Sequence, residues 1–462
     1  MPDKDRQPAS FRDPSGFLFN RHNTLYRQIN QSYRSNYDHL MASGCYQDLV
    51  SRGWLLPHEE VDQDGLGNGQ AYKVIQPHKL GFISYPYEWA FSQLKDAALL
   101  TLKIQKRALK YGLSLKDSSA YNIQFDLGSG KPVLIDTLSF EILEKGKPWV
   151  AYRQFCQHFL APLALMAYKD IRLSQLLRIY IDGIPLDLAS SLLPARTRLN
   201  FGTLTHLHLH AAAQRRFAGA STQAASASRK MNESALLGLI DSLARTVQKL
   251  SWQPKDTDWG AYYDCTNYTE ESMDQKAEIV DDFLDQASPK TVWDLGANTG
   301  RFSRIALRKG FTTIAFDIDP AAVELNYRQL KKDRESRLLP LLMDLTNPSA
   351  SLGWANRERD SLGKRANPDL VIALALIHHL AISNNIPLAL ISSYFRELAP
   401  WLLIEFVPKT DSQVRRLLAS REDIFGNYTQ DDFEKTFRQD YHIRGMQEIQ
   451  GSQRRLYLME RK

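Results

Sequence analysis

Residues 291–310 read TVWDLGANTGRFSRIALRKG, and this stretch decides the fold of the second half of the chain. It begins with a short apolar run that Asp294 ends, and a turn containing Gly296, Asn298 and Gly300 follows. Apolar residues then recur at helical spacing, so the pattern predicts a strand, a tight turn and a helix. Glycines let such a turn take positive φ and approach a ligand, and the helix that follows offers unpaired N–H groups. The stretch therefore predicts a ligand-binding turn.

A second strand pattern, TTIAFDIDP at residues 312–320, places Asp317 at its carboxyl end. An acidic side chain about twenty residues after such a turn can accept hydrogen bonds from both ribose hydroxyls of a nucleotide. The dinucleotide pattern GxGxxG is not matched, because Asn298 stands where a second glycine would fall. Asparagine tolerates left-handed backbone best among the other residues, so we still expect a bound nucleoside.

Four segments in order carry a family resemblance: DLGANTG (294–300), AFDID (315–319), LLMDLTNP (341–348) and DLVIALALIHHL (369–380). They resemble the motifs of class I S-adenosylmethionine-dependent methyltransferases, whose first motif lies under the methionine part of the cofactor. The resemblance implies S-adenosylmethionine as cofactor and a doubly wound, Rossmann-like α/β domain. The cofactor-binding residues that it implies are Asp294, Gly296, Ala297, Asn298, Gly300, Asp317, Ile318, Asp344 and Leu345. The alternative is a doubly wound domain that binds another nucleotide.

The fourth motif implies that His378 and His379 lie beside the transferred methyl group, where one of them serves as a base. Glu405, at the end of a later strand pattern, is a weaker candidate for an orienting carboxylate. The alternative is that the two histidines only shape the loop. The fourth motif has no Pro-Pro-aromatic sequence and no nearby cysteine, so we expect a hydroxyl or amine acceptor. A small molecule or glycan is favoured over RNA or protein.

The first half of the chain contains a second constellation. A helix pattern at 94–111 precedes KDSSAYNIQFDLGSGKPVLIDTLSFE, residues 116–141. The order Asp117, Asn122, Asp136 resembles the catalytic and metal-binding loops of the protein-kinase-like fold, which implies a base and two metal ligands. The segment lacks the His-Arg pair before Asp117, no Gly-rich phosphate loop is evident, and Lys73 is only a candidate strand lysine. The alternative is a hairpin with turn and cap residues in a docking or substrate-recognition module.

The chain thus divides into three parts: an α+β domain at 1–210, which resembles the kinase-like fold, a linker rich in small residues at 211–230, and the methyltransferase domain at 231–462. The last two strand patterns predict a terminal antiparallel hairpin. This layout also resembles bacterial nodulation-related methyltransferases. The aromatic-rich segment 252–268 is a candidate lid. Two alternatives to a plain methyltransferase remain: a bifunctional protein with an N-terminal phosphotransferase, and a non-catalytic cofactor-binding protein.

The composition limits location and partners. The 462 residues carry a formal net charge of +6 without a dense basic run, so nucleic acid is allowed as a partner but not favoured. Three cysteines in no CxxC spacing predict neither a disulfide framework nor a zinc site. No leader or membrane-spanning stretch is evident, so we expect a cytoplasmic protein without membrane insertion. We expect no metal site, and we interpret His206, His208 and His210 as polar positions on one face of a strand. The N-terminal domain offers a surface for a protein partner.

Overall fold

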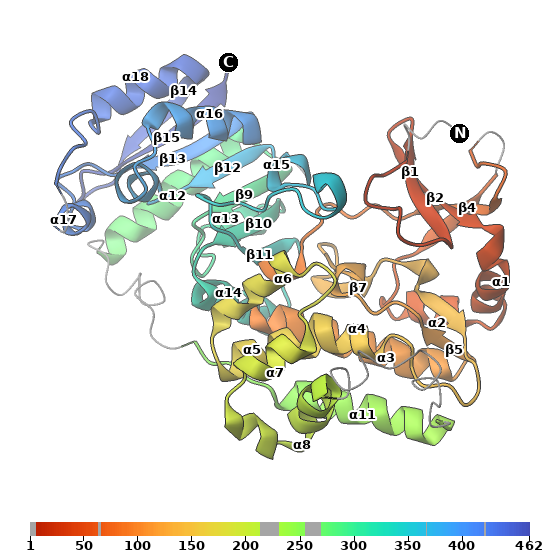
Figure 1. Ribbon diagram of the computed structural model, residues 1–462. Helices are drawn as coiled ribbons and strands as arrows, with labels where there is room; N and C mark the ends of the chain where they lie inside the picture. The colour runs from red at the N-terminus through yellow and green to blue at the C-terminus, as the bar shows by residue number, and fades with distance from the viewer. Residues whose placement is uncertain (1–5, 63–65, 213–230, 255–268, 366, 420–421) are drawn as a thin grey trace. The chain divides into compact units, whose positions relative to one another are not determined.

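The computed structural model (Figure 1) describes residues 6–62, 66–212, 231–254, 269–365, 367–419 and 422–462. The candidate lid, apart from its first residues, and most of the predicted linker lie outside these ranges. The chain forms two compact units. Unit 1 contains Met1–Asp126, Lys131–Gln253 and Leu352–Arg359, and unit 2 contains Leu127–Gly130, Pro254–Ser351 and Asp360–Lys462.

Unit 1 begins with a four-stranded antiparallel sheet in the order β1-β2-β4-β3. Its strands are β1 (Gly16–Arg21), β2 (Thr24–Asn30), β3 (His58–Val61) and β4 (Ala71–Pro77). The turn between β1 and β2 is formed by His22 and Asn23, both with positive φ, as a two-residue hairpin requires. Two small antiparallel pairs follow: β5 (Leu113–Leu115) with β8 (Phe140–Ile142), and β6 (Ile123–Asp126) with β7 (Lys131–Leu134).

The rest of unit 1 is mainly helical, which confirms the predicted α+β character. Its helices are α1 (Arg34–Ala42), α2 (Cys45–Ser51), α3 (Phe91–Leu109), α4 (Tyr152–Phe155), α5 (Ala161–Tyr168), α6 (Leu176–Ile179), α7 (Leu186–Leu192), α8 (Phe201–Thr203) and α11 (Glu233–Lys249). The interpretation of the three alternating histidines as positions on a strand is wrong, because Leu204–Leu209 forms a π-helical turn. His206 lies within hydrogen-bond distance of Tyr152 and Ser242, so its ring is part of the packing of these helices.

Helix α11 belongs to unit 1, although the sequence analysis began the second domain at residue 231. The ammonium group of Lys95 on α3 donates hydrogen bonds to the carbonyls of Gln248 (2.8 Å) and Leu250 (2.7 Å) at the end of α11. Lys106 forms an ion pair with Asp241 at 2.6 Å. Because these contacts connect residues 135 to 155 positions apart in the sequence, the amphipathic pattern of α11 could not reveal which core it covers.

Unit 2 contains a seven-stranded sheet in the order β11-β10-β9-β12-β13-β15-β14. Its strands are β9 (Thr291–Leu295), β10 (Thr312–Asp317), β11 (Leu338–Leu342), β12 (Leu370–Ala373), β13 (Trp401–Phe406), β14 (Tyr441–Glu448) and β15 (Arg455–Arg461). The first five are parallel, and β15 pairs antiparallel with both β13 and β14. The strand order reverses at β9 and β12, where doubly wound sheets bind ligands. Both the doubly wound domain and the terminal hairpin are confirmed.

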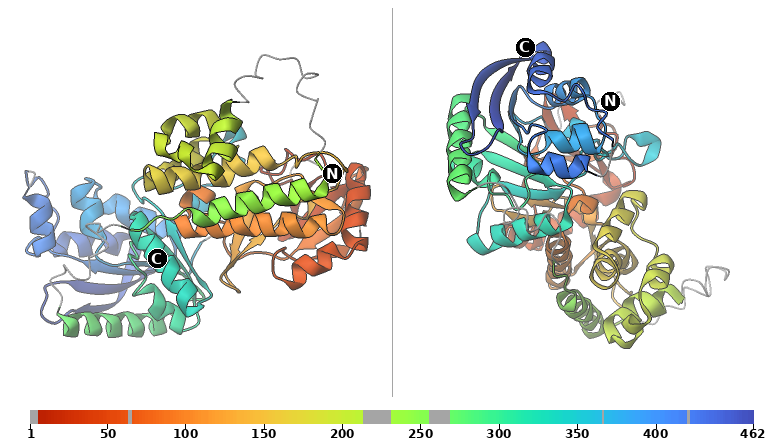
Figure 2. Two further views of the ribbon diagram at one scale, coloured as in Figure 1. Left: turned by 90° about the horizontal axis from the view of Figure 1, so that it is seen from below. Right: turned by 90° about the vertical axis from the view of Figure 1, so that its left-hand side faces the viewer.

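Helices cover both faces of this sheet (Figure 2). They are α12 (Glu270–Ala287), α13 (Ser303–Arg308), α14 (Pro320–Asp333), α15 (Leu362–Arg365), α16 (Leu388–Leu398), α17 (Ser412–Leu418) and α18 (Gln430–Asp440). The apolar sides of α12 and α13 pack on one face in a core that includes Phe283, Ile305, Leu370 and Leu403. Helices α16 and α18 pack together on the other face. None of the helices within the described ranges is long and apolar enough to cross a membrane.

Candidate functional site

The turn after β9 has the conformation that its sequence predicts. Gly296, Asn298 and Gly300 all have positive φ, of 78°, 50° and 83°. The N–H groups of Gly296 and Ala297 both donate to the carbonyl of Phe316 on β10, at 2.9 Å each. The turn is therefore fixed against the neighbouring strand.

Asp317 ends β10 beside this turn. Its Oδ2 accepts the N–H of Asn298 at 2.7 Å, and its Oδ1 accepts the N–H of Asp319 at 2.8 Å. Burial raises the pKa of Asp317 to about 6, although both hydrogen bonds favour the ionised form. Each carboxylate oxygen has a second lone pair, so the group can still accept hydrogen bonds from a ligand.

Asp294, at the carboxyl end of β9, is buried, whereas Asp317 is half-buried. The hydroxyl of Ser303 on α13 donates to its Oδ2 at 2.6 Å. Burial raises the pKa of Asp294 to about 7, with a further contribution from the nearby charge of Asp317. Two acidic groups with raised pKa values therefore lie at the ends of adjacent strands.

These elements surround a cavity of about 360 Å³, within the usual size range of small-molecule sites. Its lining consists of Met273, Lys276, Asp294, Gly296, Ala297, Asn298, Phe302, Asp317, Ile318, Met343, Asp344, Leu345, Thr346, Leu374, Ala375, Leu376, His379, Leu380, Ser383, Asn384 and Leu417. Eight of the nine residues that we expected to bind the cofactor are in this set.

Gly300 is the ninth, and it does not appear in this lining. A Cβ atom at Gly300 would lie 2.5 Å from Nδ2 of Asn326 and 2.7 Å from Nη1 of Arg304. The glycine is thus needed for the packing of the turn against α13 and α14. The sequence pattern did not distinguish this role from ligand contact.

The two histidines of the fourth motif occupy different environments. His379 lines the cavity, whereas His378 is fully buried behind it, and its two ring nitrogens have no hydrogen-bond partner within the described ranges. The ring centroids are 4.2 Å apart. Burial, with a smaller effect of the charge of Arg454, lowers the pKa of His379 to about 4. His379 is therefore neutral at pH 7.

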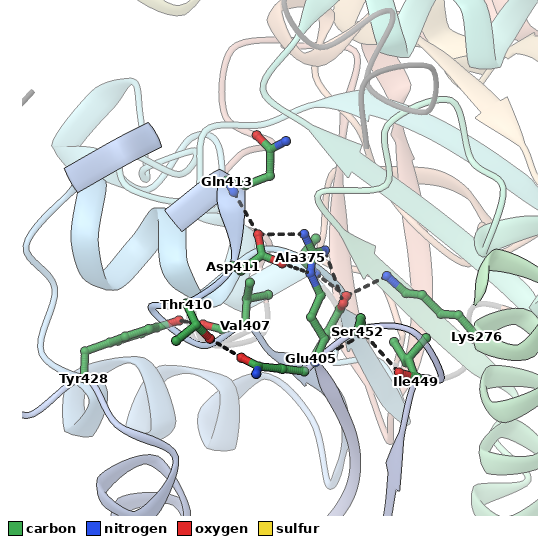
Figure 3. A network of polar contacts seen from close by, with 12 residues as sticks. Lys276, Ala375, Glu405, Val407, Thr410, Asp411, Gln413, Tyr428, Ile449 and Ser452 are labelled. Atoms are coloured by element: carbon green, nitrogen blue, oxygen red, sulfur yellow. Dashed lines mark hydrogen bonds and ion pairs between the residues drawn. The ribbon is translucent and has the colours of Figure 1, made fainter. Parts of the chain in front are cut away.

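Glu405 is not among the lining residues and is 0% exposed. Figure 3 shows it at the centre of a polar network, and its Oε2 accepts hydrogen bonds from the Lys276 ammonium at 2.6 Å and from the Ala375 N–H at 2.8 Å. Its Oε1 lies 3.5 Å from Nη1 of Arg454, which also pairs with Asp411 at 2.8 Å. An enclosed carboxylate with these partners has no access to an acceptor molecule in this conformation.

The three N-terminal candidates lie close together in unit 1. Asp136 pairs with Arg27 of β2 at 2.5 Å and accepts hydrogen bonds from the N–H of Leu138 and the hydroxyl of Ser139. The amide of Asn122 donates to the same Ser139 hydroxyl at 3.3 Å.

Asp117 accepts hydrogen bonds from the Ser119 N–H (2.9 Å) and from the Gln154 side chain (2.8 Å). Burial raises its pKa, and the charge of Asp136 raises it further. Lys73 lies elsewhere, paired with Glu60 at 2.6 Å. Arg27 is instead the cation of the sheet that reaches Asp136, and the sequence analysis missed it.

The sequence analysis also missed Lys276. A signal was present, because Met273, Lys276, Val280 and Phe283 recur at helical spacing in α12, and a lysine thus occupies the apolar stripe of this helix.

Comparisons with known proteins identify the family of this chain. A family model described as "Methyltransferase domain" matches residues 268–439. The nodulation protein NoeA of Rhizobium meliloti (strain 1021) is 35% identical over 469 residues, covering 100% of this chain and 97% of that protein. The chain belongs to the NoeA family. Its C-terminal part is a methyltransferase domain, whose cofactor is S-adenosylmethionine.

Solved structures similar to parts of this NoeA-family chain include two methyltransferases. The N-methyltransferase NodS from Bradyrhizobium japonicum WM9 is 12% identical, with 42% of this chain and 97% of NodS covered and a TM-score of 0.31. Magnesium protoporphyrin IX methyltransferase from Synechocystis PCC 6803, solved with bound SAH, is 20% identical, with coverages of 41% and 84% and a TM-score of 0.30.

A third similar structure is the bifunctional kinase-methyltransferase WbdD. It is 17% identical, 42% of this chain is covered, and the TM-score is 0.28. The chain spans about 40% of the length of WbdD.

Proposed function

We propose that this NoeA-family protein transfers a methyl group from S-adenosylmethionine to a hydroxyl or amine of a small molecule or glycan. The observation that carries the proposal is the cavity, which brings together the turn at Gly296, the acid Asp317 and the imidazole of His379. The fourth motif lacks a Pro-Pro-aromatic sequence, which argues against the exocyclic amine of a nucleic-acid base.

The lining residues fit the cofactor. Asp317 is an acceptor for the two ribose hydroxyls, and Asp344 with Leu345, which the resemblance assigns to the adenine, lines the same cavity. The positive-φ turn at Gly296 and Asn298 allows close approach of the methionine part. When bound, S-adenosylmethionine supplies a methyl group that its sulfonium already activates.

The protein then has to align the acceptor and remove one proton. We assign the removal of this proton to His379, because a neutral imidazole nitrogen can accept a hydrogen bond from the hydroxyl or amine of the substrate. When a hydroxyl oxygen gains a methyl group it becomes strongly acidic, so even a base with a pKa of about 4 takes its proton. Such a base would not deprotonate an ammonium group at pH 7. The lowered pKa therefore favours a hydroxyl, or an amine that arrives uncharged.

The first test is calorimetric titration of S-adenosylhomocysteine into the full-length protein. We expect saturable binding in the micromolar range or tighter. Asp317→Ala should lose about 1–3 kcal/mol of affinity through the lost hydrogen bonds. Asp333→Ala, on the exposed end of α14, is a matched control that should bind as the wild type does. Absence of binding by folded wild-type protein would refute the proposal.

The acceptor is then sought with labelled methyl donor and a panel of sugars and small molecules that carry free hydroxyls or amines. With the acceptor in hand, His379→Gln should lower kcat more than it raises KM, because glutamine can orient the acceptor but cannot take its proton. An unchanged kcat would remove His379 as the base.

For the N-terminal unit we propose acceptor selection in place of phosphoryl transfer. Asp136 supports this, because Arg27, the Leu138 N–H and the Ser139 hydroxyl already bind its two oxygens. Incubation with magnesium-ATP and candidate acceptors tests the alternative. ATP consumption that Asp136→Asn abolishes would establish a bifunctional enzyme and overturn this proposal.

A further inference from the structure

One face of helix α12 supplies a cation to the methyltransferase cavity. Met273 and Lys276 lie three residues apart on this face, and both line the cavity. Lys276 is only 3% exposed. Of the lining residues in the described ranges, it is the single lysine or arginine, whereas three aspartates, at 294, 317 and 344, line the same cavity.

The ammonium group of Lys276 lies beside the first-motif turn. Its Nζ is 4.9 Å from the centroid of the Phe302 ring, at the start of α13. Its charge is also close enough to Asp294 for each to affect the pKa of the other. The cation is therefore at the end of the cavity where the turn offers room for the methionine part of a cofactor.

The three aspartates of the described lining would repel a ligand carboxylate, and Lys276 is the cationic side chain of this lining that would attract it. We infer that Lys276 binds the α-carboxylate of the cofactor's amino-acid part, and that Glu405 is a positioning residue that holds the ammonium in place. This inference rests on the proposed function. It gives the cavity a means to select a complete cofactor over nucleosides without the amino-acid part.

The contacts of Glu405 explain why it is needed. Its Oε2 accepts hydrogen bonds from both the Lys276 ammonium and the N–H of Ala375 (Figure 3). Ala375 is a lining residue with a positive φ of 48°. The Oε2 atom of Glu405 thus holds both the Lys276 ammonium and the backbone of Ala375, whose positive φ is unfavourable for alanine. Burial lowers the pKa of Lys276, and the charge of Arg454 lowers it further. The charge and the hydrogen bond of Glu405, with a smaller effect of Asp294, oppose this change.

The test compares two ligands by calorimetry. S-adenosylhomocysteine carries the carboxylate, whereas 5′-deoxy-5′-methylthioadenosine keeps the adenosine and the thioether but lacks the amino-acid part. Lys276→Met should weaken S-adenosylhomocysteine roughly 10- to 100-fold, as expected for a hydrogen bond between charged groups, and leave methylthioadenosine within about twofold. Lys309→Met is the control, because Lys309 pairs with Asp281 and Asp285 outside the lining set.

A merely structural lysine gives a different result. If Lys276→Met weakens both ligands equally, or neither, the inference is wrong. If wild-type protein binds neither ligand, the proposed function fails first. Lys276→Arg, which keeps the charge, should retain most of the discrimination between the ligands, and it covers the case in which the methionine variant does not fold.

Glu405→Gln separates positioning from direct contact. Without the carboxylate, the pKa of Lys276 falls further, so the ammonium loses its proton at a lower pH. Affinity for S-adenosylhomocysteine should then decline with rising pH at least one pH unit earlier than in the wild type, while methylthioadenosine shows no such change. Coincident pH profiles in the variant and the wild type would refute the role of Glu405.

Discussion

Gly300→Ala should destabilise the methyltransferase unit strongly, although Gly300 lies outside the set of residues that line the cavity. The added Cβ would be 2.5 Å and 2.7 Å from the amide atoms of Asn326, and 2.7 Å from Nη1 of Arg304. Real Cβ atoms do not approach other heavy atoms so closely, so the amide has to move. That amide accepts a hydrogen bond from Nη1 of Arg304 at 3.0 Å, and it is buried.

Two costs add up. An alanine at φ 83° costs about 1–2 kcal/mol relative to glycine, because its Cβ clashes with its own backbone. Displacing the Asn326 amide breaks a hydrogen bond to a charged group, which costs about 1.5–3 kcal/mol. The total is roughly 2.5–5 kcal/mol. Gly296→Ala should cost only the first part, because its Cβ would meet Leu376 Cδ1 at an ordinary 3.5 Å.

The assay has to resolve one unit, since a two-unit chain need not unfold in a single step. Hydrogen–deuterium exchange of peptides from β9 and β10, followed across a urea series, reports the opening of unit 2 alone. We expect the free energy of opening of unit 2 to fall most in Gly300→Ala and less in Gly296→Ala. Peptides from β1 and β2, in unit 1, should change little in either variant. The packing role assigned to Gly300 is refuted if Gly300→Ala lowers this free energy of opening by less than about 1 kcal/mol, or by no more than Gly296→Ala does.

Three further predictions concern charged groups. Affinity for S-adenosylhomocysteine should fall about tenfold between pH 7 and pH 5, because the ionised form of Asp317 that accepts both hydrogen bonds is lost as pH falls through its raised pKa of about 6. Calorimetry at several pH values across this range measures the affinity. If Asp317→Asn shows the same pH dependence of affinity as the wild type, the prediction is wrong. Arg454→Met should lower the free energy of unfolding, measured in urea, by about 3–5 kcal/mol, because it leaves Glu405 with one cation fewer in a fully buried site. A decrease of less than about 1 kcal/mol would argue against a stabilising role of this ion-pair network. Arg27→Met should lower the free energy of unfolding by about 1–3 kcal/mol, because buried Asp136 would lose its cation but keep the hydrogen bonds from the Leu138 N–H and the Ser139 hydroxyl. Unfolding of unit 1 at unchanged urea concentration would contradict this last prediction.

The acids at the strand ends could be predicted from the sequence. Apolar runs delimit β9 and β10, and the carboxyl ends of parallel strands meet at one edge of a sheet. Asp294 and Asp317 therefore had to lie together, and Asp344 follows the next strand. Order along the chain was sufficient here, because each of these residues is positioned by its own strand.

Residues whose role depends on a distant partner could not be assigned in this way. Glu405 ends a strand, as its pattern suggests, but its function is set by Lys276 and Arg454, which lie 129 and 49 residues away in the sequence. The same holds for Gly300 in the turn, whose neighbour Asn326 belongs to α14. A pattern within one segment shows which residues are polar or small. It does not show what they touch.

The charges of the cavity also restrict what it can bind. Burial raises the pKa of Asp317 to about 6 and the pKa of Asp294 to about 7, both well above the usual value of an aspartate. A ligand that brings positive charge would lower both pKa values again and gain affinity by doing so, whereas an anionic nucleotide would raise them further. S-adenosylmethionine carries an ammonium and a sulfonium together with one carboxylate, and the cavity offers acids together with one lysine. The electrostatics thus favour this cofactor over the nucleotide phosphates that many doubly wound domains bind, for a reason independent of the motif sequence.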